Sequence, residues 1–129
     1  MQWLTEKPDP VRDLLAGARA ELARQTVTGY LERAGLRILD RDWTCRDGKL
    51  EIVAAERQVM VICQIQHRSA GSRTPAQAIT RRRGRQLRRL AVRWLDAHGV
   101  LFDEVRIDAV ILTPDPLGGF AVEHLRGVA

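Results

Sequence analysis

The sequence predicts an α/β fold, in which a mixed sheet of about five strands is flanked by helices in the order αβββαββ. Two amphipathic helical patterns and several short β-branched runs support this prediction. With 129 residues, 45% of them hydrophobic and 29% charged, the chain suits one globular domain over 1–129, with residues 1–8 as a loose lead-in. No apolar run approaches the ~20 residues of a membrane span, so we expect a cytoplasmic protein without an export signal or membrane contact.

The first helix is predicted to begin at Asp9, an N-cap carboxylate followed by Pro10 at the first helical position. Gly35 fits the left-handed residue that ends a helix. Between them, apolar residues keep a helical stripe that resumes in a shifted phase in its second half: Val11, Leu14, Leu15, Ala18 and Leu22, then Val27, Tyr30, Leu31 and Ala34.

The predicted strands are arranged around a hairpin. Residues 36–43 form the first strand, and a turn at 46–48 leads to residues 49–54 and 59–66, joined by 55–58. Residues 104–112 and 121–125 complete the sheet. Because side chains alternate along a strand, Lys49 and Glu51 share one face, as do Gln64 and Gln66. We expect Glu51, Gln64 and Gln66 to cluster on one face of adjacent strands.

A second long helix is predicted from its N-cap, Thr80, to His98, with Gly99 as its terminator. Its apolar stripe comprises Leu87, Leu90, Ala91, Trp94 and Leu95, and the opposite side carries Arg82, Arg85, Arg89 and Arg93. Arg83 is the exception, because its angular position aims it at the junction of the helix with the sheet. Before this helix, residues 75–79 can form one helical turn, and the loop at 67–74 carries Arg68 and Arg73.

The two cysteines, Cys45 and Cys63, lie in strands or beside them and lack the CxxC pairing of zinc or redox sites. We interpret both as buried free thiols in a reducing compartment.

The positive charge is concentrated in the middle of the chain. Residues 57–93 contain ten arginines and no acid, whereas the remainder has sixteen acids and eleven bases, giving formal charges of +10 and −5. This asymmetry indicates an anionic partner, and we favour nucleic acid over a merely solvated face. The candidate phosphate-binding residues are Arg68, Arg73, Arg81, Arg82, Arg83, Arg85, Arg88, Arg89 and Arg93.

Five motifs follow one another in a characteristic order: YLERAGLRILDRDW at 30–43, RDGKLEIVA at 46–54, VMVICQIQHRS at 59–69, PAQAIT at 75–80 and VRIDAV at 105–110. Over about residues 20–125 the chain resembles the YraN-like family of predicted nucleases. The resemblance implies a restriction-endonuclease-like core, related in fold to Holliday junction resolvases. It also implies a site in which two carboxylates hold a divalent cation against the scissile phosphate and a nearby lysine assists.

That site is degraded in this chain. The family's Gly-Glu-Ile-Asp corresponds to residues 48–51, where Lys49 and Glu51 stand, and its Glu-Val-Lys corresponds to residues 64–66, where Gln64 and Gln66 stand. The glutamate usual on the first helix falls on Arg24. The resemblance therefore leaves Glu51, Gln64 and Gln66 as vestigial catalytic positions. No metal cofactor is expected, and Glu51 is the ligand if any metal binds.

Three functional hypotheses follow. We favour a nuclease-fold protein that binds nucleic acid, DNA rather than RNA, and has lost metal-dependent phosphodiester cleavage. The first alternative is an active Mg- or Mn-dependent endonuclease or junction resolvase with a relocated site, in which Lys49 replaces the missing lysine and Glu51, Asp108 or Glu21 gathers the metal. We interpret Asp108, which matches an aspartate of the family, as structural. The second alternative is a protein-interaction subunit, and a homodimer remains open.

Overall fold

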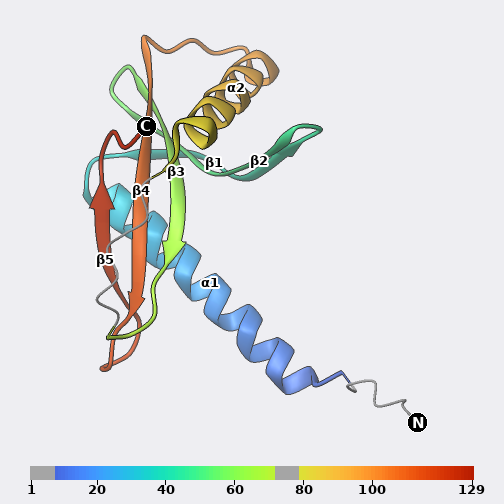
Figure 1. Ribbon diagram of the computed structural model, residues 1–129, viewed down its shortest axis with the longest axis vertical. Helices are drawn as coiled ribbons and strands as arrows, with labels where there is room; N and C mark the ends of the chain where they lie inside the picture. The colour runs from blue at the N-terminus through green and yellow to red at the C-terminus, as the bar shows by residue number, and fades with distance from the viewer. Residues whose placement is uncertain (1–7, 72–78) are drawn as a thin grey trace.

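The computed structural model describes residues 8–71 and 79–129, and its elements follow the predicted order αβββαββ (Figure 1). Most strands extend slightly beyond their predicted bounds, because antiparallel pairing continues up to the turns. The predicted lead-in and the helical turn at 75–79 lie largely outside the described residues. The elements are α1 (Pro10–Arg33), β1 (Arg37–Cys45), β2 (Gly48–Glu56), β3 (Val59–His67), α2 (Arg81–His98), β4 (Glu104–Pro114) and β5 (Phe120–Leu125).

The five strands form one sheet in the order β1-β2-β3-β4-β5. Its neighbours pair antiparallel except β3 and β4, which are parallel, so the sheet is mixed as predicted. The parallel pair requires a crossover, and α2 supplies it. The hairpin of β2 and β3 closes through Arg57 and Gln58 alone, with Arg57 at φ 56°.

The helices cover opposite faces of the sheet, because alternate residues of β3 enter two separate cores. Val61 and Cys63 pack with α1, and Met60 and Ile62 pack with α2. Cys63 is fully buried and Cys45 is partly exposed; both are free thiols. Within the described parts of the chain, no helix is both long and apolar enough to cross a membrane.

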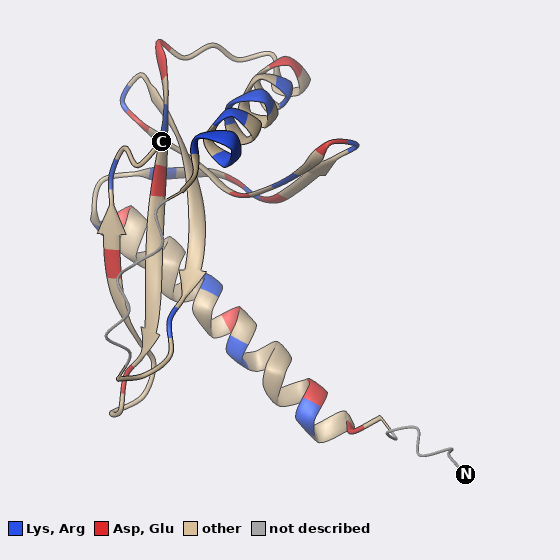
Figure 2. Cartoon of the chain, in the orientation of Figure 1, with Lys and Arg blue, Asp and Glu red and all other residues tan. Residues whose placement is uncertain are grey.

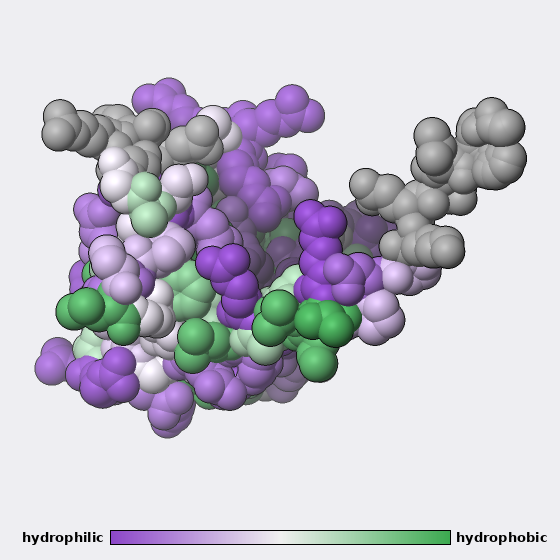
Figure 3. Space-filling model, turned by 90° about the horizontal axis from the view of Figure 1, so that it is seen from below, coloured by the Kyte–Doolittle hydropathy of each residue, from purple (hydrophilic) through white to green (hydrophobic). Residues whose placement is uncertain are grey.

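The first half of α1 differs from what its apolar stripe suggests. Asp9 caps the helix as predicted, but only the second half contacts the sheet, burying Ala23, Val27, Thr28 and Leu31. The earlier part projects as an arm on which Leu14 is 73% exposed, and Figure 3 shows apolar atoms on its surface. Helical periodicity predicts a stripe but does not determine whether the sheet is wide enough to cover it.

The second helix matches its prediction at both ends. Thr80 Oγ1 accepts a hydrogen bond from the Arg83 backbone N–H at 3.0 Å, and Gly99 ends α2 in the left-handed region at φ 64°. The predicted stripe packs against the sheet through Leu87, Leu90, Ala91 and Trp94. The arginines predicted on the opposite side are exposed, so α2 presents a basic face to solvent (Figure 2).

Candidate functional site

The candidate site lies where β2 separates from β3. Strand β2 pairs with β1 from Gly48 onward, but its pairing with β3 begins only at Ile52, opposite Cys63. The early part of β2 therefore leaves the sheet together with β1 as a two-stranded ribbon (Figure 1). Glu51 is the last residue before the two strands join, so its side chain lies at the fork.

Glu51 and Gln64 meet at this fork, as the strand pattern predicts. Gln64 Nε2 donates to Glu51 Oε1 at 3.2 Å, and the Ile65 N–H lies 3.4 Å from the same oxygen. Gln66 is half-buried and, by alternation, lies on the same face of β3 as Gln64. Burial raises the pKa of Glu51, while the Ile65 N–H and the charge of Lys49 act in the opposite direction.

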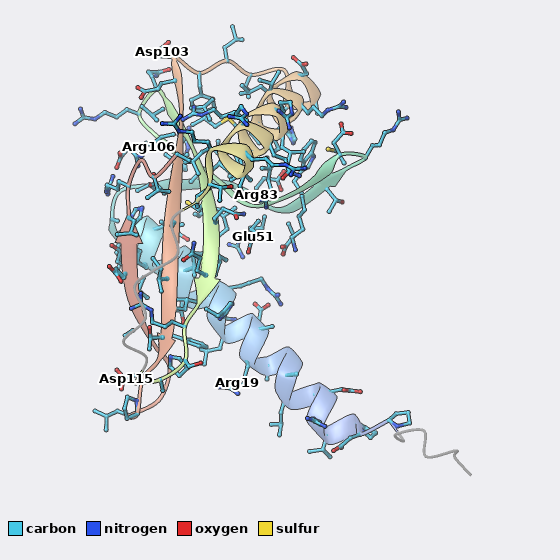
Figure 4. The ribbon with its side chains drawn as sticks, in the orientation of Figure 1. Arg19, Glu51, Arg83, Asp103, Arg106 and Asp115 are labelled. Atoms are coloured by element: carbon cyan, nitrogen blue, oxygen red, sulfur yellow. The ribbon has the colours of Figure 1, made fainter. Side chains whose placement is uncertain are left out.

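An arginine of α2 completes the polar contacts at the fork. Arg83 Nε donates to Gln64 Oε1 at 3.3 Å, and Arg83 Nη1 donates to Gln86 Oε1 at 2.8 Å. The sequence pattern placed Arg83 toward the sheet, and this placement is confirmed. The Gln64 amide thus bridges Glu51 and a guanidinium, so positive charge lies on the α2 side of the fork (Figure 4).

On the α1 side, Glu51 lines a cavity of about 150 Å³, here called the inner cavity. Its charged or titratable lining residues are Arg24, Arg41, Asp42, Lys49, Glu51 and His67. Lys49 Nζ lies 3.1 Å from an Asp42 carboxylate oxygen, and Arg24 Nη2 lies 2.8 Å from Glu21 on the same helix. Three positions that the family resemblance assigns to carboxylates, now Arg24, Lys49 and Glu51, therefore surround one cavity.

Sequence reasoning missed Arg41 and Asp42 as members of this site. The sequence did contain a signal for them, which is the tight turn at Arg46 and Asp47. This turn sets the register of β1 against β2, so that Trp43 pairs with Leu50 and Arg41 pairs with Ile52. That register brings the residue between them, Asp42, opposite Glu51.

A divalent metal does not fit these residues. Mg²⁺ is usually held by one or two carboxylates together with phosphates and waters, but here the Asp42 carboxylate is paired with Lys49 and the Glu51 carboxylate accepts a hydrogen bond from Gln64. Among residues 8–71 and 79–129, no group of three or more His, Cys, Asp and Glu side chains is placed to hold a metal ion. The surrounding cations oppose a second positive charge.

Asp108 is committed to a separate, buried network. Arg106 donates to it from Nε at 2.8 Å and from Nη2 at 3.0 Å, His124 Nε2 lies 2.8 Å away, and the Gly127 N–H donates at 3.0 Å. Burial alone would raise the pKa of Asp108, but these hydrogen bonds hold it below its ordinary value. Arg106 also binds Glu56, which pairs with Arg126. This carboxylate holds β4, β5 and the C-terminal segment together.

The exposed arginines of α2 border an open groove of about 490 Å³ between the helix and the β1–β2 turn, here called the arginine groove. It is lined by Asp47, Arg82, Gln86, Arg89, Leu90 and Arg93. Asp47 and Arg93 form an ion pair. The groove therefore carries three guanidinium groups and one carboxylate, and Arg81 and Arg85 are exposed nearby.

The other predicted phosphate-binding arginines have varied surroundings. Arg88 donates to the Val105 carbonyl at 2.8 Å and the Ala129 carbonyl at 2.7 Å, which ties α2 to β4 and the end of the chain. The Arg68 side chain is 23% exposed and lies 4.0 Å from Glu123. Arg73 lies outside the described residues.

The fold and site define a class: an α/β chain with a five-stranded mixed sheet, an arrangement consistent with a restriction-endonuclease-like core, and a half-buried carboxylate at the strand fork. The model of the uncharacterised protein family UPF0102, the YraN-like family, matches residues 23–112. A UPF0102 protein of Beutenbergia cavernae is 42% identical over 100 residues, covering 77% of this chain and 85% of its own length. One from Frankia alni is 38% identical over 112 residues, covering 85% and 92%. The chain belongs to the UPF0102 family, as the sequence motifs indicated.

Proposed function

We propose that this protein binds nucleic acid through the arginine groove and does not catalyse metal-dependent cleavage of the phosphodiester backbone. The arginine groove is the observation that carries the proposal. Helix α2 contains seven arginines and a single acid, Asp96, and most of its guanidinium groups are exposed. Guanidinium groups bind phosphate oxygens with charge-assisted hydrogen bonds, and a surface with so few acids favours a polyanion.

These contacts give affinity without reading sequence. Phosphates are identical along a strand, so the groove fixes the position of the backbone and leaves the bases unread. The family resemblance favours DNA over RNA as the ligand.

The proposed loss of cleavage rests on the composition of the fork. In a metal-dependent nuclease, carboxylates hold the cation and a lysine stabilises developing charge. Here Gln64 supplies an amide, its oxygen accepts from Arg83, and Lys49 places a cation beside Glu51. Mg²⁺ loses its water reluctantly, so a site with this balance of charge does not capture it.

The test replaces four exposed α2 arginines with glutamine: Arg82, Arg85, Arg89 and Arg93. Folding should survive, because these side chains lie away from the core. Binding of a DNA duplex should weaken, and the slope of log K against log salt should flatten by about 0.7 to 0.9 for each lost phosphate contact.

The matched control replaces four exposed arginines elsewhere, which are Arg12, Arg33, Arg37 and Arg57. Both variants lose four positive charges, so a general effect of net charge would appear in both. Equal affinities and equal salt slopes in the two variants would contradict the groove as the binding surface.

A metal-dependent nuclease with a relocated site is the second candidate, and one observation favours it. Asp42 and Glu51 line the same inner cavity, so two carboxylates do lie near one another. In that case Mg²⁺ or Mn²⁺ would support DNA cleavage by the wild-type protein, and Glu51→Ala would abolish it. We expect no metal-dependent cleavage above background.

A further inference from the structure

A second basic region lies on the α1 side of the sheet, away from the arginine groove. The inner cavity at Glu51 shares two lining residues, Ala20 and His67, with a neighbouring outer cavity of about 370 Å³. The outer cavity is also lined by Arg19, Arg68, Ser69, Pro114 and Phe120. The two cavities are therefore neighbours beside α1, and the inner one reaches the fork. Arg19 on α1 and Glu51 on β2 mark the two cavities (Figure 4).

The inner cavity gathers cationic side chains. Arg24, Arg41 and Lys49 line it together with the carboxylates of Asp42 and Glu51, and Glu21 pairs with Arg24 from the same helix. Asp42 is paired with Lys49, which orients that ammonium group at the rim of the cavity.

We infer that the inner cavity binds the terminal phosphate of a nucleic-acid strand, with Arg24, Arg41 and Lys49 as its phosphate ligands. This inference rests on the proposed function, because it takes nucleic acid as the ligand and assigns its terminal phosphate to the inner cavity. Two of these cations, Arg24 and Lys49, stand where the family resemblance places metal-binding carboxylates. The protein would thus contact phosphate with its own side chains at the place where a metal-dependent relative would use a cation.

The sizes of the two cavities favour a strand end over an internal phosphate. The inner cavity, at about 150 Å³, is well below the ~300 Å³ at which pockets for drug-sized ligands begin, so it accommodates a phosphate group but not a whole nucleotide. The outer cavity, at about 370 Å³, reaches that range. A terminal phosphate also carries more charge than an internal diester, about −1.5 to −2 at neutral pH.

The outer cavity suits the nucleoside that follows the phosphate. Arg19 and Arg68 line this cavity and would contact the backbone of the strand. Phe120, which also packs against the core, would offer the part of its ring that faces the cavity for base stacking. Stacking on an aromatic side chain is tolerant of sequence, because every base presents a π face. The site therefore distinguishes phosphorylated ends from other ends without selecting a base.

The test measures binding of one short single-stranded DNA in three forms: with a 5′ phosphate, with a 3′ phosphate and with neither. Fluorescence anisotropy at fixed salt should show that one phosphorylated form binds about tenfold more tightly than the unphosphorylated form, as expected for charge-assisted hydrogen bonds. Arg24→Gln and Lys49→Gln should each reduce this preference. Both side chains are about half exposed, at 44% and 52%, so these changes leave the core intact.

Arg12→Gln is the matched control, because Arg12 is an exposed arginine on α1 outside both cavities. It should keep the full preference. The α2 variant described above should lose overall affinity but retain the ratio between phosphorylated and unphosphorylated strands. Equal binding of all three strands by the wild-type protein would overturn the inference and leave the arginine groove unaffected.

A second measurement separates this site from nucleic-acid binding altogether. Inorganic phosphate titrated into the wild-type protein should shift the amide NMR signals of residues around Glu51, and Lys49→Gln should weaken that response. If phosphate binds at the fork but no oligonucleotide binds, the proposed function fails and the cavity is a site for free phosphate. If oligonucleotides bind and phosphate leaves the fork signals unchanged, the phosphate site is refuted.

Discussion

Replacing Asp108 with asparagine tests whether this carboxylate is structural. Asp108 is 0% exposed and interacts with Arg106, His124 and the Gly127 N–H. The asparagine side chain would keep the shape of the aspartate but would exchange one acceptor oxygen for an NH₂ group. That group would face another donor, and the Arg106 guanidinium would lose its buried counter-charge.

The expected loss follows from this geometry. Removing one partner of a buried ion pair costs about 3 to 5 kcal/mol, because the remaining charge is left uncompensated. A domain of this size has a total stability of about 5 to 15 kcal/mol, so the variant should remain folded with a small margin. At roughly 3 to 5 °C per kcal/mol, the melting temperature should fall by about 10 to 20 °C.

Thermal unfolding followed by circular dichroism measures this loss, with Asp96→Asn as the control. Asp96 is exposed on α2, and its substitution should change stability by about 0.5 kcal/mol or less. The pH dependence adds a second check. The pKa of Asp108 is lowered in the folded state, so its stabilisation is present above the unfolded pKa of about 3.9 and disappears as pH falls through the folded value. The wild-type and variant curves should therefore converge in acid.

A loss below about 1 kcal/mol at neutral pH would refute this account of Asp108. It would mean that the network is dispensable and that the carboxylate is free to serve another role, as the relocated-site hypothesis requires. Convergence of the two curves at high rather than low pH would contradict the sign of the pKa shift.

Two further predictions concern the fork. Restoring the family pattern with Lys49→Glu, Gln64→Glu and Gln66→Lys should create measurable Mn²⁺ binding in calorimetry before any cleavage appears. The first two changes replace a cation and an amide beside Glu51 with two carboxylates, and the third restores the family's lysine. A variant that binds no metal would show that other groups are missing. Glu51→Gln should raise the melting temperature at pH 7 and leave it unchanged below about pH 4, where Glu51 is protonated in both states. Because the pKa of Glu51 is raised in the folded state, its contribution to folding stability is most favourable below the unfolded pKa and is lost as pH rises. A Glu51→Gln variant that is less stable than the wild type at pH 7 would contradict the direction of the shift.

Local patterns were sufficient for much of the fold. Thr80 and Gly99 bound α2 as predicted, because helix caps depend on side chains and backbone angles within a few residues. Strand alternation and the short hairpin likewise predicted that Gln64 would lie beside Glu51, and the two side chains form a hydrogen bond. These predictions succeed because each depends on the geometry of a single element or a single turn.

The sequence by itself therefore determined the order of the elements, the caps and basic face of α2, and the family. Only the tertiary structure decided what lies opposite each face. It left Leu14 exposed on the arm of α1, enclosed Asp108 with residues from β5 and the C-terminal segment, and brought Arg24 and Lys49 around the cavity at Glu51. The physical reason is that a local period specifies which side chains share a face, whereas burial and charge pairing depend on segments far apart in the chain.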